Sequence, residues 1–198
     1  MQNVELIFVT KNANKIKEAN AALSALGIKL KAPDFEVEKL EVQDDRVENI
    51  SLFAAKHAYE AIKEPFVVED DGLFVDELNG FPGPYTAYAY KTIGIEGVLK
   101  LLEGRNNRKA YFISAVTLQV DGKFYLFTKK VEGEISNAPR GKEGFGFDPI
   151  FIPKGQSKTY AEMELDEKSK ISHRAGAFLQ MANFFVNYYL KQKSWVPP

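Results

Sequence analysis

The sequence predicts an α/β fold in which helices flank a mixed β-sheet. Strand-like and helix-like patterns alternate over residues 6–72, as expected of strands joined by helices. An Asp121-Gly122 pair between two β-type runs then predicts an antiparallel hairpin. The chain has 198 residues, of which 45% are hydrophobic and 13% aromatic. This supply of apolar side chains lets one domain over residues 1–198 bury a sizeable core.

The first part of the chain predicts strands and helices in alternation. Residues 6–10 form a β-branched and aromatic run typical of a buried strand, and residues 14–26 carry apolar side chains at helical spacing. A second helix is expected over 47–62. An interior strand is expected over 66–68, ending in the acidic run 69–72.

The rest of the chain predicts a hairpin, two loops rich in glycine and two helices. Because a hairpin joins antiparallel strands, the sheet is not expected to be purely parallel. In chain order, the segments are a loop over 79–85, a short helix over 96–102, hairpin strands over 110–120 and 123–127, a loop over 141–149, and a last helix from about Ser172 to about Lys191.

The composition excludes several classes of protein and site. The 26 basic and 27 acidic side chains balance, which argues against a dedicated binder of nucleic acid or anionic membranes. The absence of cysteine excludes disulfides, thiol nucleophiles, zinc–thiolate sites and iron–sulfur clusters. Two histidines cannot form a three-histidine zinc site, so a divalent metal is expected on carboxylates. No signal peptide or membrane-spanning apolar run is seen, so a cytoplasmic protein is expected.

The first candidate motif is Thr10-Lys11-Asn12-Ala13-Asn14-Lys15, between a strand and a helix. Free N–H groups and the positive helix end make such a junction a natural phosphate site, and Lys15 adds a cation. The alternative is a helix capped by an asparagine, with solvated lysines, which this segment taken alone favours. The segment is not a P-loop, because the Gly-x-x-x-x-Gly-Lys-Ser/Thr pattern is absent.

The second motif is the acidic run Glu69-Asp70-Asp71-Gly72. Three adjacent carboxylates at a strand end repel one another and need compensation. Bound Mg²⁺ would supply it, and a carboxylate beside the ion could activate water. The alternative is an acidic strand end that turns at Gly72 and stays hydrated. The sequence leaves both interpretations open.

The third motif is the loop Gly144-Phe145-Gly146-Phe147-Asp148-Pro149. Two phenylalanines beside glycines could sandwich a planar ring. They could equally be ordinary core anchors, which is the commoner role of phenylalanine. Asp148 could accept hydrogen bonds from a ligand or only fix the turn before Pro149.

The fourth motif is Ser172-His173-Arg174, at the expected start of the last helix. Ser172 fits an N-cap, but cations in the first turn oppose the helix dipole by ~0.3–1 kcal/mol each. A bound anion or polar base edge would offset this conflict. The alternative is an exposed pair that tolerates the cost. Together the four motifs offer the cations, carboxylates and rings that a Mg–nucleoside triphosphate requires.

Six motifs along the chain match one known family in register. The chain resembles the inosine triphosphate pyrophosphatase family, which hydrolyses non-standard purine nucleoside triphosphates. Each motif alone is weak, but the six follow the family order and cover nearly the whole chain. The matching segments are residues 8–15, 68–73, 79–85, 138–141, 144–149 and 160–174.

The resemblance implies a fold, an activity and a set of site residues. It implies a long central mixed sheet with flanking helices in two lobes around a nucleotide-binding cleft, and usually a homodimer. It also implies Mg²⁺-dependent cleavage of ITP, dITP or XTP to the monophosphate and pyrophosphate. The residues carried over are Asp70 as general base, Glu41 and Asp70 as the metal site, Thr10 to Lys15 as the triphosphate cradle with Lys56 and Lys168 as further cations, Phe145, Gly146, Phe147 and Asp148 as the base clamp, and His173 and Arg174 as readers of the purine edge.

Two positions depart from the family pattern. Lys11 stands where the family usually has glycine, and a positive φ there would strain Lys11 by ~1–3 kcal/mol. Asp71 stands where the family often has serine or threonine. That exchange removes a hydroxyl contact to the substrate and adds negative charge near a phosphate.

Two other functions stay open. A nucleotide pyrophosphatase of the Maf type, acting on pyrimidine or modified nucleotides, shares the general fold. The Phe-Gly-Phe-Asp loop and the Ser-His-Arg corner favour the inosine family over it. A non-catalytic nucleotide sensor is the second alternative, and the presence of both Asp70 and Glu41 argues against it.

Overall fold

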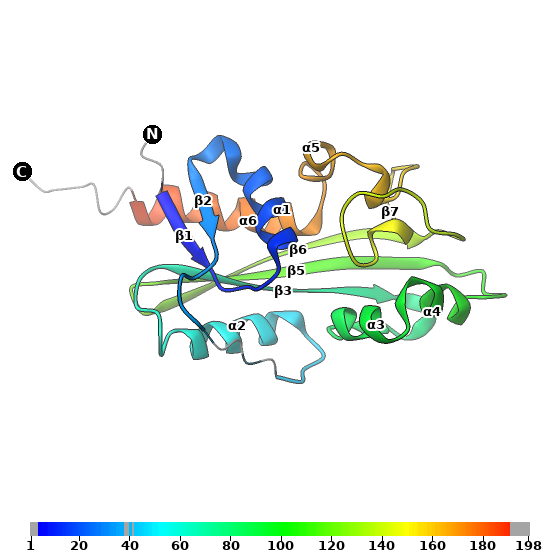
Figure 1. The fold of residues 1–198 in the computed structure, drawn as a ribbon, viewed down its shortest axis with the longest axis horizontal. Coiled ribbons are helices and arrows are strands. Elements are labelled where there is room, and N and C mark those ends of the chain that lie inside the picture. The colour runs from blue at the N-terminus through cyan, green and yellow to red at the C-terminus, as the bar shows by residue number, and fades with distance from the viewer. Residues whose placement is uncertain (1–3, 38–39, 41, 191–198) are drawn as a thin grey trace, which may run out of the picture.

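The structure, a computed structural model, describes residues 4–37, 40 and 42–190 (Figure 1). Within these residues one sheet has the strand order β2-β1-β3-β5-β6-β7, and β4 pairs with β3. The strands are β1 (Val4–Phe8), β2 (Ile28–Lys31), β3 (Phe66–Val75), β4 (Pro82–Gly83), β5 (Lys109–Val120), β6 (Lys123–Ile135) and β7 (Phe151–Pro153).

Helices cover both sides of the long strands. Figure 1 shows α1 and α6 on one side of β3 and β5, and α2, α3 and α4 on the other. Among the described residues no helix is both long and apolar enough to cross a membrane. The helices are α1 (Ala13–Leu23), α2 (Val47–Ala58), α3 (Thr86–Thr92), α4 (Gly94–Leu101), α5 (Leu165–Lys168) and α6 (His173–Phe184).

The sheet is mixed, as predicted. β1 pairs in parallel with β2 and with β3, and α1 and α2 supply the connections that parallel neighbours need. From β3 onward the strands β3, β5, β6 and β7 pair antiparallel. The α/β class with a central mixed sheet is therefore confirmed. The single-domain organisation over residues 1–198 stays a prediction.

The predicted hairpin is confirmed, with longer strands than expected. Asp121 and Gly122 both have positive φ (50° and 74°), which is the conformation a tight two-residue hairpin turn requires. Pairing runs from Val120↔Lys123 to Lys109↔Glu134. β6 therefore continues to Ile135, well beyond residue 127. Several residues of this extension are exposed and charged, but they keep their pairing with β5.

The expectation that the acidic run ends a strand is wrong. β3 continues through it to Val75, and every residue from Phe66 to Val75 pairs with β5. Gly72 does not turn the chain. It pairs with Ile113, and its lack of a side chain leaves room for the carbonyl of Gly83, which lies 2.5 Å from where a Cβ would be.

The remaining boundaries differ from the predictions mainly at their ends. α6 begins as expected, since the Ser172 side chain accepts a hydrogen bond from the N–H of Ala175. It ends at Phe184, a π-helical segment follows to Leu190, and Lys191 lies outside the described residues. β2 and α3 are not among the predicted elements.

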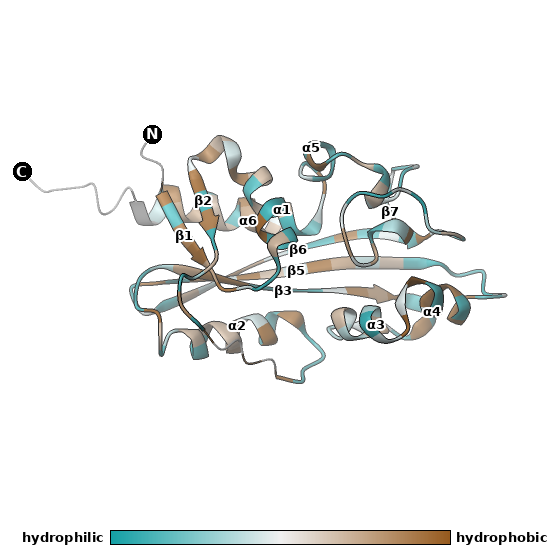
Figure 2. Ribbon diagram, viewed as in Figure 1, coloured by the Kyte–Doolittle hydropathy of each residue, from teal (hydrophilic) through white to brown (hydrophobic). Residues whose placement is uncertain are grey.

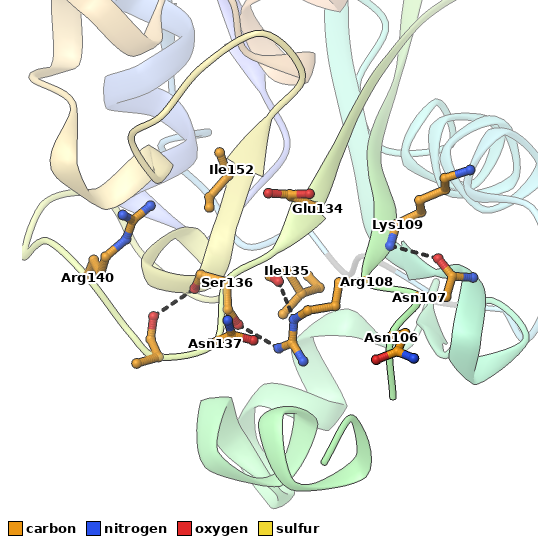
Figure 3. A pocket seen from close by; sticks show the side chains of 11 residues that line it. Asn106, Asn107, Arg108, Lys109, Glu134, Ile135, Ser136, Asn137, Arg140 and Ile152 are labelled. Carbon is orange, nitrogen blue, oxygen red and sulfur yellow. Dashed lines mark hydrogen bonds between the residues drawn. The ribbon is translucent and has the colours of Figure 1, made fainter. Parts of the chain in front are cut away.

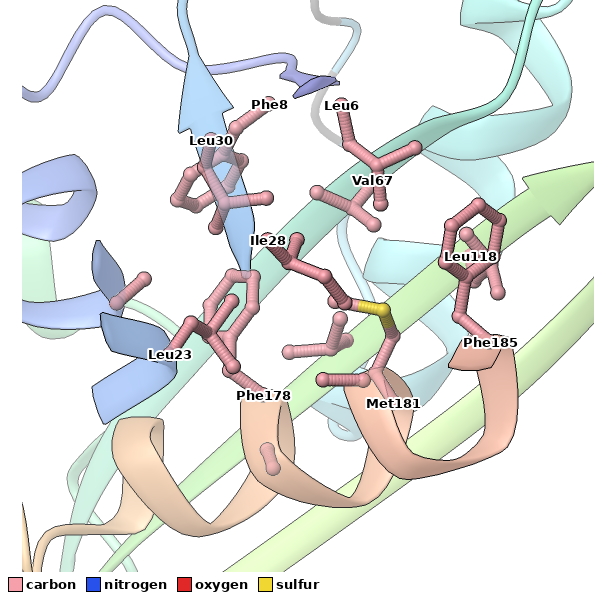
Figure 4. Close-up of a cluster of buried hydrophobic side chains, with 14 of the residues drawn as sticks. Leu6, Phe8, Leu23, Ile28, Leu30, Val67, Leu118, Phe178, Met181 and Phe185 are labelled. Atoms are coloured by element: carbon pink, nitrogen blue, oxygen red, sulfur yellow. The ribbon is translucent and has the colours of Figure 1, made fainter. Parts of the chain in front are cut away.

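The main core lies between the strands and the helices α1 and α6. Figure 4 shows side chains of β1, β2, β3 and β5 converging on Leu23, Phe178, Met181 and Phe185. The rings of Phe8 and Phe178 meet edge-on with centroids 5.1 Å apart. In Figure 2 the hydrophobic colour follows β1 and β5, whereas the start of α1 is hydrophilic. The core thus fixes α1 and α6 against the sheet with their N-terminal ends beside β3.

Candidate active site

The segment between β1 and α1 is a capped helix start. The side chain of Asn12 accepts hydrogen bonds from the N–H groups of Asn14 (3.0 Å) and Lys15 (3.4 Å), so the capped-helix alternative is confirmed. Thr10 Oγ1 accepts from the N–H of Asn12 (3.1 Å). Lys11, Ala13 and Asn14 are exposed.

Lys11 is not in a left-handed conformation. Among the described residues, the non-glycine residues with positive φ are Asn79 and Asp121. The departure from glycine at position 11 therefore carries no backbone strain, and this loop accommodates a lysine whose side chain reaches solvent.

Lys15 is not a solvated cation. Its Nζ forms ion pairs with Glu69 Oε2 at 2.8 Å and with Asp71 Oδ1. Burial lowers the pKa of Lys15, but the carboxylates of Asp71 and Glu69 outweigh it and leave that pKa raised. Lys15 thus remains charged and links α1 to β3.

Arg174, at the start of α6, is buried among three carboxylates. Its Nε donates to Glu69 Oε1 (3.0 Å), its Nη1 donates to Glu18 Oε2 (2.6 Å), and its Nη2 lies 3.1 Å from Asp71 Oδ1. The alternative of an exposed cationic pair is therefore wrong. The conflict of a cation with the helix dipole is offset by carboxylates of the protein itself.

Lys168 completes the group of cations. Its Nζ contacts Glu18 Oε1 and donates to Asp148 Oδ2 (2.6 Å). Asp148 Oδ2 also accepts from the N–H of Phe145 (2.8 Å), so Asp148 both fixes the loop and pairs with a cation. Burial raises the pKa of Asp148, which Lys168 opposes.

These contacts form one buried ion-pair network. Glu18, which sequence reasoning missed, joins Lys168 and Arg174. Its place in the sequence could have indicated this role, because Glu18 follows Lys15 by about one helical turn and lies between apolar Ile16 and Ala19. The members of the network are Lys15, Glu18, Glu69, Asp71, Asp148, Lys168 and Arg174.

The two phenylalanines of the glycine-rich loop have different environments. Phe147 is buried in a core cluster and meets Tyr90 edge-on, with centroids 5.4 Å apart. It is a core anchor, so the expectation of a two-ring sandwich is wrong for Phe147. Phe145 is half-buried, and its ring centroid lies 5.5 Å from Lys168 Nζ and 5.2 Å from Arg174 Cζ.

The loop geometry depends on glycine at position 144. Gly144 has a φ of 72°, and a Cβ there would lie 2.1 Å from Asp148 Oδ2. Gly146 also has positive φ (63°) but open space around it. A side chain at position 144 would therefore displace Asp148 from Lys168 and from the N–H of Phe145.

His173 is buried against an aromatic ring. Its imidazole stacks on Phe112 with centroids 4.5 Å apart and an interplanar angle of 6°. Nε2 lies 3.9 Å from Asp71 Oδ2, and among the described residues neither ring nitrogen has a hydrogen-bond partner. Burial lowers the pKa of His173 despite Asp71, which leaves a neutral ring beside the network.

The acidic run is divided between two faces of the sheet. Side chains alternate along a strand, so Glu69 and Asp71 share one face and Asp70 lies on the other. Val68, on the Asp70 face, packs with residues of α2. The expectation that all three carboxylates form one cluster needing an external cation is therefore wrong, because Lys15 and Arg174 compensate Glu69 and Asp71.

Two of the expected site residues, Lys56 and Glu41, are not among the described members of the network. Lys56 is exposed on α2, which covers the Asp70 face, so the structure does not bring it to the network (Figure 1). Glu41 lies outside the described residues. Among the described residues no three histidine, aspartate or glutamate side chains are grouped to hold a metal.

A large cavity lies elsewhere, beside the ends of β5 and β6. Its volume is about 780 Å³, and Figure 3 shows its lining around Arg108, whose Nε and Nη2 donate to the carbonyls of Ile135 and Ser136 (both 2.6 Å). No residue of the network lines it. The candidate site is instead built from ion-paired, largely buried side chains.

Sequence and structure comparisons place the chain among known proteins. The model of the Ham1 family matches residues 6–184. The chain is 48% identical over 183 residues to a dITP/XTP pyrophosphatase of Hyperthermus butylicus, covering 92% of this chain and 95% of that protein. It is 46% identical over 192 residues to a dITP/XTP pyrophosphatase of Saccharolobus solfataricus, covering 96% and 98%.

Solved structures agree with these relatives. A HAM1 protein from Coxiella burnetii superposes with a TM-score of 0.80 at 31% identity, covering 92% of this chain and 98% of that one. A structure from Mycobacterium abscessus, described as a nucleoside-triphosphatase or dITP/XTP pyrophosphatase, gives 0.69 at 29% identity, covering 90% and 98%. The resemblance seen in the sequence is confirmed, and the chain belongs to the Ham1 family.

Proposed function

We propose that this chain hydrolyses non-standard purine nucleoside triphosphates, namely ITP, dITP and XTP, to the monophosphate and pyrophosphate. Relatives named dITP/XTP pyrophosphatase match it over nearly their whole length. The observation that carries the proposal is the network, which joins α1, β3, the 144–149 loop and the start of α6 in one place. The protein is thus an enzyme, a hydrolase of phosphoric anhydride bonds.

The triphosphate is assigned to the start of α1. The exposed residues Lys11, Ala13 and Asn14 flank the cap, and the helix end attracts negative charge. Lys15 is one of the two most exposed members of the network, so it is the cation that a phosphate meets. Until a phosphate binds, Glu69 and Asp71 hold Lys15 in place.

The base is assigned to the side of the network formed by the loop and α6. Phe145 offers a ring face, and Phe147 supports the loop from the core. Arg174 can only donate hydrogen bonds and ionised Asp148 can only accept them. Such a pair suits the 6-oxo and N1–H edge of hypoxanthine or xanthine, whereas adenine presents the opposite pattern. Lys168 and His173 are assigned to the same base-binding side of the network.

Asp70 is assigned as the general base. Its carboxylate takes a proton from a water molecule whose oxygen bonds to the α-phosphorus. The bond between that phosphorus and the oxygen bridging to the β-phosphate breaks, and pyrophosphate leaves with the electron pair. The water oxygen therefore ends in the monophosphate.

A magnesium ion fits the carboxylate oxygens of Asp70. Mg²⁺ prefers oxygen ligands and is commonly held by one or two carboxylates plus substrate phosphates, so it needs no cage of three acidic side chains. Asp70 with Glu41 would hold it. When bound, the ion would supply positive charge that neutralises the phosphates of the substrate.

The proposal also covers the oligomeric state and the cellular location. We propose that the enzyme is a cytoplasmic homodimer that acts on a free nucleotide and has no nucleic acid or membrane as partner. Exposed apolar side chains support a dimer surface around α3: Phe81, Tyr85, Tyr88 and Ile93 are 40–69% exposed. Sedimentation of the wild type and of Tyr88→Glu tests the dimer, and a monomeric wild type would contradict it.

A panel of nucleoside triphosphates tests the function. Pyrophosphate release should be efficient with ITP, dITP and XTP, slow with ATP, and lost after chelation of divalent metals. In ¹⁸O-labelled water the label should appear in the monophosphate. Faster turnover of pyrimidine or modified nucleotides would favour a Maf-type enzyme. Tight binding of ITP without turnover would favour a nucleotide sensor.

A further inference from the structure

We infer that Asp71 is a specificity-determining residue that makes the site reject phosphate groups unaccompanied by a divalent cation. Its carboxylate occupies Lys15 and Arg174 as an internal anion. The inference rests on the proposed function in one respect, namely that Lys15 meets the phosphates of the substrate.

Asp71 holds the cations of both halves of the site. Oδ1 forms the ion pair with Lys15 and lies 3.1 Å from Arg174 Nη2, so one oxygen bridges the phosphate side and the base side. Oδ2 faces His173 Nε2 at 3.9 Å. An anion that approaches Lys15 must therefore either displace Asp71 or lie beside its negative charge.

The pair of Lys15 and Asp71 is the accessible part of the network. Their side chains are 14% and 12% exposed, whereas those of the other five members are 8% exposed or less. A ligand entering from solvent therefore meets this pair before Glu69 or Arg174. Because Glu69 also holds Lys15, losing Asp71 would leave Lys15 in place but one partner short.

The charge balance sets the direction of the effect. The network contains three cations and four carboxylates, so it carries a net negative charge before any ligand arrives. Like charges placed together in a partly desolvated site repel one another, and that repulsion disfavours binding of a bare phosphate. Replacing Asp71 with a neutral side chain makes the network balanced.

Binding of inorganic pyrophosphate tests the inference without any turnover. Calorimetric titration should show weak binding to the wild type in the presence of a chelator. Asp71→Asn and Asp71→Ser should each bind metal-free pyrophosphate at least about tenfold more tightly. The enhancement of binding by Mg²⁺ should be correspondingly smaller in these variants. Asp71→Glu, which keeps the charge, should behave as the wild type.

Asp76→Asn is the matched control. Asp76 is exposed and directly follows β3, five residues or roughly 16 Å along the chain from Asp71, beyond the Debye length of ~8–10 Å. It loses the same charge and should leave pyrophosphate binding unchanged. Equal metal-free affinity in wild type and Asp71→Asn would overturn the inference. Binding of pyrophosphate to neither protein, with or without Mg²⁺, would overturn the phosphate role of Lys15 and with it the proposed function.

Discussion

The two faces of β3 treat neighbouring carboxylates in opposite ways. On one face Glu69 and Asp71 are buried and tied to Lys15 and Arg174. Asp70 lies on the other face, on the side covered by α2. The strand alternation thus separates a carboxylate assigned to proton transfer from carboxylates that hold cations in position.

This separation has an electrostatic reason. A carboxylate paired with two cations is held ionised and hydrogen-bonded, so it is a poor acceptor for a further proton. Burial raises the pKa of Asp71, but Lys15 and Arg174 outweigh it and leave that pKa lowered. A general base must instead be available to water. The two faces of β3 should therefore respond differently to substitution, and four experiments test this expectation.

The largest effect is expected at Asp70. Asp70→Asn should lower kcat for ITP by ~10²–10⁴, the usual loss when a general base is removed, with little change in substrate binding. Steady-state kinetics and calorimetric binding of a non-hydrolysable ITP analogue measure the two quantities. Normal turnover in this variant would remove the functional difference between the faces.

On the other face, Arg174→Ala should act on stability as well as on selectivity. Removing the guanidinium leaves Glu18, Glu69 and Asp71 short of a buried partner, which typically costs ~3–5 kcal/mol of unfolding free energy. Urea denaturation measures this loss. The ratio of kcat/KM for ITP to that for ATP should also fall, since a buried hydrogen-bonding reader can contribute up to ~10⁴-fold discrimination. A variant with undiminished discrimination would show that another residue reads the base.

The loop beside the network allows a finer test with two phenylalanines. Phe147→Ala should destabilise the fold by ~3–5 kcal/mol because Phe147 is 1% exposed within a core cluster. Phe145→Ala should cost less stability and instead raise KM for ITP, because Phe145 lies under Lys168 and Arg174. Chemical denaturation and kinetics on both variants separate the roles. The reverse pattern would exchange the core and ligand assignments.

The smallest effect concerns pH. Burial lowers the pKa of His173 below its ordinary value of 6.5, so in acid the unfolded chain takes up this proton before the native protein does. The free energy of unfolding should therefore fall as the pH drops below 6.5, by at most ~1.4 kcal/mol per pH unit. This window lies above the ordinary pKa values of Glu18 (4.5) and Asp71 (3.8).

A histidine exchange isolates that contribution. His173→Gln should flatten the dependence between about pH 6.5 and 5, as measured by urea denaturation at several pH values. If His173→Gln kept the wild-type slope of unfolding free energy against pH, the pH dependence would come from other groups.

Much of the fold could be predicted because its signals are local. The Asp121-Gly122 turn, the Ser172 cap and the helical spacing in α1 each follow from neighbouring residues. β2 carries a visible alternation, with Ile28 and Leu30 buried and Lys29 exposed, but four residues give a weak signal. The length of β3 could not be predicted, because its acidic residues are compensated by cations from α1 and α6.

The candidate site shows the same limit. All four motifs were visible in the sequence, and all four meet in the network. They contribute Lys15, the pair Glu69 and Asp71, Asp148, and Arg174. Which partner each charge takes is decided by packing between segments more than a hundred residues apart, as with Arg174 and Glu18. For the same reason Glu18 was missed, and the partial burial of Phe145 and full burial of Phe147 could not be distinguished.

The register of the sheet also has a consequence for the order of folding. β5 and β6 are joined by a two-residue turn, whereas the parallel pairing of β1 with β3 brings Ile7 beside Phe66. Contacts between near neighbours in sequence form faster than those that close long loops. The network needs α1 from one end of the chain and α6 from the other. We therefore expect a newly made chain to form its central hairpin first and to acquire its binding site only at the last stage of folding.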